Sequence, residues 1–326
     1  MSISSNNATL NEVLTVVNNL PLKKEEQEKT VTITESGLTE VIPDENKTLS
    51  KVSVNVEIEQ GDEPSSPPWL DTRTITDWSY FCYKDSDRAG LLSHVDTSNG
   101  TNFSYMFHSN TSLKTTVPLF NTSNGTNFSY MFYGCNKIIS IPELDTSNGT
   151  DFYGMFQKCS GITTVPQLNT SNGTNFYAMF SGCSKLTTIP QLNTSKGTNF
   201  GYMFSGCTKL TTIQLDISNG TSFDSIFYNC TNLTSIQITT TKADMSTNTF
   251  QGCTALTDIT IGEGFANSIY LNYSNNLTQE SLHGMIENLA DLTGLTSKTF
   301  KIGATNLAKV DEAHIEMLNA KNWTYS

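Results

Sequence analysis

The chain has 326 residues, of which 37% are apolar and 15% are charged, and its net charge is −12. A chain this acidic lacks the clustered Lys and Arg that nucleic acid and anionic membranes attract, so we expect neither nucleic-acid binding nor membrane insertion. Ser, Thr and Asn are abundant instead, which is typical of a β-rich fold with polar turns.

Residues 1–28 are predicted to form an N-terminal anchor. Residues 8–20 carry apolar side chains on one face at helical spacing, and Pro21 follows them. These side chains are Leu10, Val13, Leu14, Val17 and Leu20. A helix this short is marginal alone, so it either joins a second copy in a homo-oligomer or docks on its own chain. The first 22 residues have no basic segment and no continuous apolar run, so we expect no signal peptide and synthesis in the cytoplasm.

A small β module is predicted over residues 29–60. Val31–Thr34 and Val52–Ile58 alternate apolar and polar residues as strands do, and residues 35–50 supply turns between them. Residues 23–29 are charged, and we expect them to be solvated. Pro, Gly and acidic residues then predict a hinge over residues 61–68.

Residues 69–270 contain a tract that occurs six times, beginning at Asp96-Thr-Ser-Asn-Gly-Thr-Asn-Phe103 and recurring every 23 to 25 residues. A period of this size predicts a solenoid in which each repeat is one coil of about 24 residues. A degenerate first coil is expected at residues 75–81, and a weaker last one at residues 250–261. The Ser-Asn-Gly of each tract predicts a tight turn, since Asn and Gly tolerate positive φ.

One side of each coil should face the core. In the second copy, the side chains expected to point inward are Phe128, Phe132, Cys135, Ile138, Ile141 and Leu144. Six cysteines recur with the repeat and form a ladder: Cys135, Cys159, Cys183, Cys207, Cys230 and Cys253. Because all six should point inward in one register, we expect reduced, buried thiols rather than disulfides, and Cys82 lies off the ladder.

Residues 271–326 break the period and predict an α/β cap for the last coil. The expected elements are a helix over 277–289 opened by Thr278, a strand over 298–302, a helix over 310–320 and a strand over 323–325. The predicted fold is thus a β-rich solenoid with a small N-terminal helix and β module and a C-terminal α/β cap.

Two surfaces of the solenoid are candidates for ligand binding. The aromatic one carries Tyr105, Tyr130, Tyr133, Tyr153, Tyr177, Tyr202 and Tyr228, with His108 beside them. Exposed tyrosines suit stacking on sugars or contacts with protein, but they could equally lie flat over the phenylalanines and cover them. The other surface is a threonine face, for which plain β-propensity is the alternative to binding. It comprises Thr163, Thr164, Thr187, Thr188, Thr211, Thr212, Thr257 and Asp258.

No catalytic residue, metal site or cofactor is predicted. The four histidines (His94, His108, His283 and His314) lie in unrelated sequence contexts, and no C-x2-C pair, nucleophile elbow or phosphate loop is present. The residue that opens each tract is Asp in some copies and Asn in others, which favours a turn cap over an acid or base.

The pattern Met-Phe-x-Gly-Cys-x-x-Leu-Thr-Thr-Ile-Pro-x-Leu, best seen over Met179 to Leu192, resembles the BspA-like leucine-rich repeats. The resemblance covers residues 75–262, and residues 277–324 are similar to the cap that often follows such repeats. Residues 29–58 resemble small modules of phage tail and baseplate proteins. The family occurs in bacterial surface proteins and in structural proteins of phages and prophages of Gram-positive bacteria.

The resemblance implies a non-enzymatic binding or scaffolding role. Surface members of the family usually carry a secretion signal or wall anchor, and this chain has neither, so the resemblance favours a phage virion protein of a tail fibre, baseplate or head fibre. Residues 1–60 would then attach to other virion proteins, and the solenoid would bind a host cell-surface glycan or protein. The alternatives are a bacterial cell-surface adhesin and a purely structural decoration protein.

Overall fold

The computed structural model describes part of the chain, which divides into two units that we treat separately. Unit 1 comprises residues 1–76 and 91–99, and unit 2 comprises residues 77–90 and 100–326. The predicted helix over 8–20 and the predicted hinge over 61–68 lie outside the described residues. The backbone alone is described for residues 26–34, 37–38 and 48–56, and side chains are also described for residues 72–84, 89, 92, 95–113, 117–238 and 243–326.

Unit 1 contains a three-stranded sheet in the order β2-β1-β3, in which β1 is Glu26–Thr34, β2 is Gly37–Leu38 and β3 is Thr48–Val56. The two long strands include most of the residues predicted as strands, and they pair in parallel, while β1 and β2 pair antiparallel. Strand β1 starts at Glu26, five residues before the predicted start at Val31.

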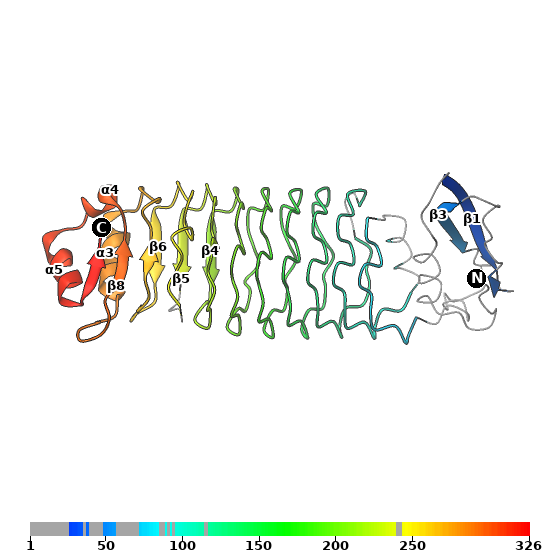
Figure 1. Cartoon of the computed structure of the whole chain (residues 1–326), viewed down its shortest axis with the longest axis horizontal. Helices are drawn as coiled ribbons and strands as arrows, with labels where there is room; N and C mark the ends of the chain where they lie inside the picture. The colour runs from blue at the N-terminus through cyan, green and yellow to red at the C-terminus, as the bar shows by residue number, and fades with distance from the viewer. Residues whose placement is uncertain are drawn as a thin grey trace. The chain divides into compact units, whose positions relative to one another are not determined.

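Unit 2 is a stack of coils that lie side by side from the cyan to the yellow part of the chain (Figure 1). One parallel bridge joins each coil to the next, in the series Asp77, Asn102, Asn127, Asp151, Asn175, Asn199 and Ser222. Beyond each bridge every second amide donates to the next coil: Phe128 N to Asp151 O at 2.9 Å, then Tyr130 N to Tyr153 O at 2.7 Å. The sequence period is therefore the stacking register, and Trp78, buried and bonded to Asn102 O at 2.8 Å, confirms the degenerate first coil.

Regular strands form in only three coils of the described stack. These are β4 (Thr212–Leu215), β5 (Ser235–Ile238) and β6 (Asp258–Ile261), which pair in parallel. In the preceding coils a proline follows the corresponding Ile or Val, at Pro142, Pro166 and Pro190. Proline has no N–H to donate to a ladder, whereas Gln214, Gln237 and Thr260 at this place do. The solenoid is thus richer in turns and poorer in strands than the composition suggested.

The core of unit 2 is two columns of stacked phenylalanines, and all of the residues predicted to point inward from the second copy are buried. Ring centroids within a column lie 5.1 to 6.0 Å apart, for example 5.1 Å from Phe107 to Phe132 and 6.0 Å from Phe204 to Phe227. One column contains Phe103, Phe128, Phe152, Phe176, Phe200 and Phe223; the other contains Phe107, Phe132, Phe156, Phe180, Phe204, Phe227 and Phe250.

The glycine of each tract leaves space for the phenylalanine rings of the core. The predicted tight turn is present, with Gly149 N donating to Thr146 O at 2.9 Å, but the tract glycines do not have positive φ. A Cβ added to Gly149 would lie 2.6 Å from Cζ of Phe152, 3.0 Å from the carbonyl oxygen of Thr146 and 3.1 Å from Cε2 of Phe128. The missing side chain therefore makes room for the phenylalanine columns.

We predict that Gly149→Ala lowers the free energy of unfolding by about 1–3 kcal/mol, because the added methyl overpacks the column. The measurement is chemical denaturation of the full chain. Gly284→Ala is the matched control, since a Cβ there meets nothing within 4 Å and alanine is the better helix former. Equal effects of the two substitutions would contradict this account of the tract.

The cysteine ladder contributes hydrogen bonds as well as packing. Each ladder thiol donates to the carbonyl of the second phenylalanine of the preceding coil, as Cys183 does to Phe156 at 3.0 Å and Cys207 to Phe180 at 3.1 Å. All seven cysteines are free and buried. In the coil before Cys135 the ladder position is Asn110, and its amide donates to Cys82 O at 3.2 Å. Cys82 itself occupies a place that phenylalanine holds in later coils.

The C-terminal cap contains β7 (Ile269–Tyr270), α3 (Gln279–Asn288), β8 (Lys298–Lys301), α4 (Ala304–Leu307), α5 (Glu312–Ala320) and β9 (Trp323–Tyr325). Strands β7, β8 and β9 form a parallel sheet. Thr278 caps α3 by accepting from the Ser281 amide, as expected for the residue that opens this helix. The four predicted cap elements are present, and the short helix α4 was not predicted.

Candidate functional site

Six tyrosine rings form a continuous column along the outside of the coils. We call Tyr80, Tyr105, Tyr130, Tyr153, Tyr177 and Tyr202 the tyrosine column. Successive ring centroids lie between 4.7 Å, from Tyr80 to Tyr105, and 5.6 Å, from Tyr177 to Tyr202. Tyr80 is 51% exposed and the other five rings are half-buried. The column therefore presents ring edges and hydroxyls to solvent across six successive coils.

A shorter side column of three rings lies beside it. His108 stacks on Tyr133 at 4.4 Å and on Tyr83 at 5.3 Å. The two columns touch, since Tyr130 and Tyr133 make an edge contact at 5.5 Å. The ammonium of Lys158 lies 5.1 Å from the centre of the Tyr133 ring, within cation–π range. Of the predicted tyrosines, Tyr228 alone joins neither column among the described rings.

The tyrosine column is continuous in space, although the tyrosines do not all stand at the same position of the sequence repeat. Tyr105, Tyr130 and Tyr202 stand two residues after the first phenylalanine and have φ of 54 to 57°. Left-handed φ costs a residue with a bulky side chain about 1–2 kcal/mol. Where Gly154 and Ala178 take this place, Tyr153 and Tyr177 supply the ring from one residue earlier.

Glycines make room at both points where the column changes position. A Cβ on Gly154 would lie 2.8 Å from Cδ1 of Tyr130, and a Cβ on Gly201 would lie 3.0 Å from Cδ2 of Tyr177. The neighbouring ring thus rests directly on the glycine backbone. Local folding alone does not require this arrangement, since any small residue would close the coil.

Burial acts on the ionisation of three rings of the tyrosine column and of His108 in the side column. Burial, followed by the neighbouring tyrosines, raises the pKa of Tyr105, Tyr130 and Tyr177 above 10.0. Burial lowers the pKa of His108 below 6.5, which outweighs the backbone hydrogen bond that raises it. The candidate surface therefore offers neutral hydroxyls and aromatic edges, with Lys84 and Lys158 as cations at its side.

Stacking within the column decides how it can contact a ligand. The four inner rings, Tyr105 to Tyr177, each have a ring neighbour on both sides. Tyr80 stacks on Tyr105 and Tyr153 stacks on Tyr177, so a sugar cannot stack on the ring faces that these pairs share. The other three contacts of the column are tilted by 32 to 57°. The column rings also do not lie flat on the phenylalanines, because their described ring partners are tyrosine and histidine. Hydroxyls and edges are what the column offers a ligand.

The threonine face uses many of its hydroxyls between coils. Thr187 Oγ1 donates to Thr163 O at 3.4 Å, and Thr257 Oγ1 donates to Thr234 O at 3.1 Å. Thr164, Thr188 and Thr212 are exposed. A donor already bonded to the backbone is not free for a ligand, so this face serves coil stacking first.

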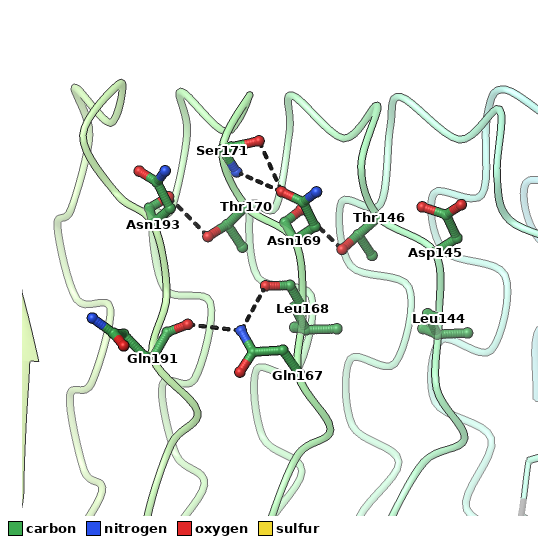
Figure 2. A pocket seen from close by; sticks show the side chains of 10 residues that line it. All are labelled: Leu144, Asp145, Thr146, Gln167, Leu168, Asn169, Thr170, Ser171, Gln191 and Asn193. Atoms are coloured by element: carbon green, nitrogen blue, oxygen red, sulfur yellow. Dashed lines mark hydrogen bonds between the residues drawn. The ribbon is translucent and has the colours of Figure 1, made fainter.

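A shallow groove of about 380 Å³ crosses three coils on the side of the tract (Figure 2). Its polar groups are largely bonded to one another: Thr146 Oγ1 donates to Asn169 O at 2.9 Å, and Gln167 Nε2 donates to Gln191 O at 2.8 Å. Asp145 accepts from the Ser147 amide at 3.0 Å, and hydrogen bonds from Ser147 lower the pKa of its carboxyl. Asn169 and Asn193 accept from Ser171 and Ser195 in the same way, which confirms the turn-capping role.

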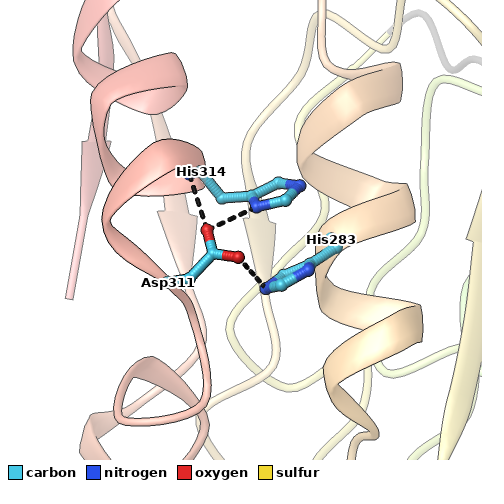
Figure 3. A group of neighbouring side chains, drawn as sticks. All are labelled: His283, Asp311 and His314. Atoms are coloured by element: carbon cyan, nitrogen blue, oxygen red, sulfur yellow. Dashed lines mark hydrogen bonds and ion pairs between the residues drawn. The ribbon is translucent and has the colours of Figure 1, made fainter.

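Two histidines that are far apart in the sequence meet in the cap, so the expectation that all four lie in unrelated contexts is wrong. His283 of α3 and His314 of α5 stack at 3.6 Å, and Asp311 lies against both (Figure 3). No sequence motif signals this cluster, because 28 residues separate His283 from Asp311 in the sequence. The packing of α3 against α5 brings them together.

Comparison with known families divides the repeats into two parts. Residues 178–290 match the family described as "BspA type Leucine rich repeat region (6 copies)", and residues 64–167 match "Mycoplasma protein of unknown function, DUF285". Residues 178–290 carry BspA-type leucine-rich repeats. No curated protein matches the chain.

The division between the two family matches falls inside an uninterrupted ladder. The bridges from Asp151 to Asn175 and from Asn175 to Asn199 cross it without a change of register, and the tyrosine column crosses it too. The BspA-type repeats and the preceding coils are therefore one structural array. Within the described part of the chain, no helix has the length and apolarity needed to cross a bilayer.

Proposed function

We propose that the chain is a non-enzymatic binding protein that attaches to a polymer on a cell surface through its tyrosine column. A host wall glycan is the ligand class that fits best. Its hydroxyl groups can pair with a row of neutral phenol hydroxyls, and its repeating units can engage several coils at once. Individually weak contacts then multiply along the array.

The observation that carries this proposal is the continuity of the tyrosine column. Tyrosine occupies left-handed backbone at Tyr105, Tyr130 and Tyr202, where glycine would fit without strain. Each of these coils nevertheless has a tyrosine ring in the column. Where Gly154 and Ala178 occupy the left-handed position, Tyr153 and Tyr177 carry the ring instead. Ala178 and Ser225 have the same left-handed φ at this place, so the coil imposes the backbone, and the continuity of the rings is what supports the proposal.

The test is binding of fluorescently labelled full-length protein to a panel of Gram-positive cells and their purified wall polysaccharides. We expect saturable binding to some strains that soluble polysaccharide from the same strains displaces. Absence of binding to every strain by folded protein would overturn the proposal and favour a decoration protein without a receptor.

We further propose that a phage virion displays the array, attached through residues 1–60. The resemblance of residues 29–58 to tail and baseplate modules supports this setting. A bacterial surface adhesin is the second candidate, and the BspA-type repeats of residues 178–290 favour it. Antibody labelling in electron microscopy separates them: label on particles supports the virion, and label on uninfected producer cells supports the adhesin.

A further inference from the structure

A three-residue cluster in the C-terminal cap has the composition of a metal site. His283 lies on α3, His314 lies on α5, and Asp311 is the N-cap residue of α5 (Figure 3). His314 Nδ1 is 2.6 Å from Asp311 Oδ1, and His283 Nε2 is 3.7 Å from Asp311 Oδ2. One ligand atom from each residue lies within 4.8 Å of the other two.

His283 is the member of the cluster whose ring nitrogen Nε2 makes no hydrogen bond. Its Nε2 is buried and has no hydrogen bond, since 3.7 Å to the carboxylate is too long for one. The two imidazoles stack with their centroids 3.6 Å apart and their planes 15° from parallel, so one ring has to turn for both in-plane lone pairs to reach a shared ion. A cation bound to the Nε2 lone pair would satisfy this nitrogen while keeping the ring neutral.

His314 is oriented for the same task by Glu287. The Oε1 atom of Glu287 lies 3.5 Å from Nε2 of His314, on the ring edge away from Asp311. An ion bound at Nδ1 would replace the 2.6 Å contact between Nδ1 and Asp311 Oδ1, and Nε2 would then donate to Glu287. Metal-binding histidines are commonly fixed in one tautomer by an outer carboxylate in this way.

We propose that His283, Asp311 and His314 bind one divalent transition-metal ion, and that zinc fits best. Two imidazoles and one carboxylate are ligands that zinc accepts, and three protein ligands leave a fourth position for water. Bonds of about 2.0–2.1 Å place tetrahedral ligand atoms about 3.3 Å apart, between the 2.6 and 3.7 Å distances here. The ion would link α3 to α5 and tighten the cap that covers the last coil. This site is independent of the tyrosine column.

The test is titration of metal-free full-length protein, freed of any affinity tag, with ZnCl2 in competition with a chromophoric chelator. We expect one zinc per chain. Asp311→Asn should weaken binding by at least about 10-fold while retaining the helix cap, because asparagine caps as well as aspartate. His283→Gln should weaken it similarly, and His108→Gln, which removes a histidine elsewhere, should leave it unchanged.

Cobalt substitution identifies the ligands directly. Weak visible bands without sulfur-to-metal charge transfer would support the His–Asp–His site. Strong near-ultraviolet charge-transfer bands would show that cysteines bind the metal, and would overturn the proposal. Absence of saturable zinc binding, or equal affinity in the wild type and both cap variants, would overturn it as well.

Discussion

Raising the pH from 8 to 10 should destabilise this protein more than any single substitution. Burial raises the pKa of Cys135, Cys183 and Cys253 from 9.0 to about 12, and it raises the pKa of the other three ladder thiols well above 9.0. In the unfolded chain these thiols ionise near 9.0. Above that pH the unfolded state releases protons that the folded state keeps, so the free energy of unfolding falls until the folded pKa is reached.

The size of this effect follows from the number of thiols. Each pKa unit is worth about 1.4 kcal/mol, so six thiols together remove roughly 8 kcal/mol by pH 10. Whole domains are stable by about 5–15 kcal/mol, so the loss is enough to unfold the repeats. The stabilisation is fully present below pH 9, and the measurement is urea denaturation at intervals of half a pH unit from 7 to 10.5.

A double variant isolates the thiols from the tyrosines, which titrate in the same range. Cys183→Ala with Cys207→Ala removes two of the six ladder thiols and leaves every tyrosine in place. The decrease of stability with pH should become about one third shallower. An unchanged slope would mean that the ladder thiols do not control the alkaline transition.

Phe180→Ala should lower the free energy of unfolding by about 3–5 kcal/mol. Phe180 is fully buried in the middle of its column, with Phe156 and Phe204 each 5.5 Å away. Its neighbours belong to other coils, so the cavity weakens two coil interfaces rather than one. Equilibrium denaturation of the full chain measures the loss.

Two comparisons support the interpretation of that experiment. Phe180→Leu keeps most of the volume and should cost markedly less than alanine. Leu119→Ala, at a side chain that is 73% exposed, should change stability by less than about 0.5 kcal/mol. If Phe180→Ala were as mild as Leu119→Ala, the column would not be the core of the stack.

The core could be predicted because every copy repeats it. Apolar residues equivalent to Phe128, Cys135 and Ile138 recur in most coils, and a stack buries whatever recurs on one side. The strand content was overestimated because one residue per coil determines whether a strand forms. Proline at positions 142, 166 and 190 has no N–H to donate, whereas Gln214 and Gln237 have one. The prolines are visible in the sequence. Their effect on strand pairing becomes clear only from the register of the coils, which shows where each missing N–H would have bonded.

The tyrosine column could be predicted only in part. The sequence identified the tyrosines as a candidate surface, but it did not show that Tyr130 and Tyr153, which stand at different positions of the repeat, contact each other. The structure places both rings in one column, 4.8 Å apart. The histidine cluster of the cap was missed altogether, because it depends on how α3 packs against α5 and no spacing within either helix reports that.

The most direct test of the central claim compares the wild type with a variant that carries phenylalanine at Tyr105, Tyr130, Tyr153 and Tyr177. The substitutions retain the stacked rings and remove four hydroxyls, so the variant should unfold at the wild-type denaturant concentration within a few tenths of molar. We expect its affinity for the wall polysaccharide that binds the wild type to fall at least about 10-fold, because hydroxyls and edges are the accessible groups. Tyr273→Phe, outside the column, should bind as the wild type does. Undiminished binding by the four-site variant would contradict the assignment of the tyrosine column as the recognition surface.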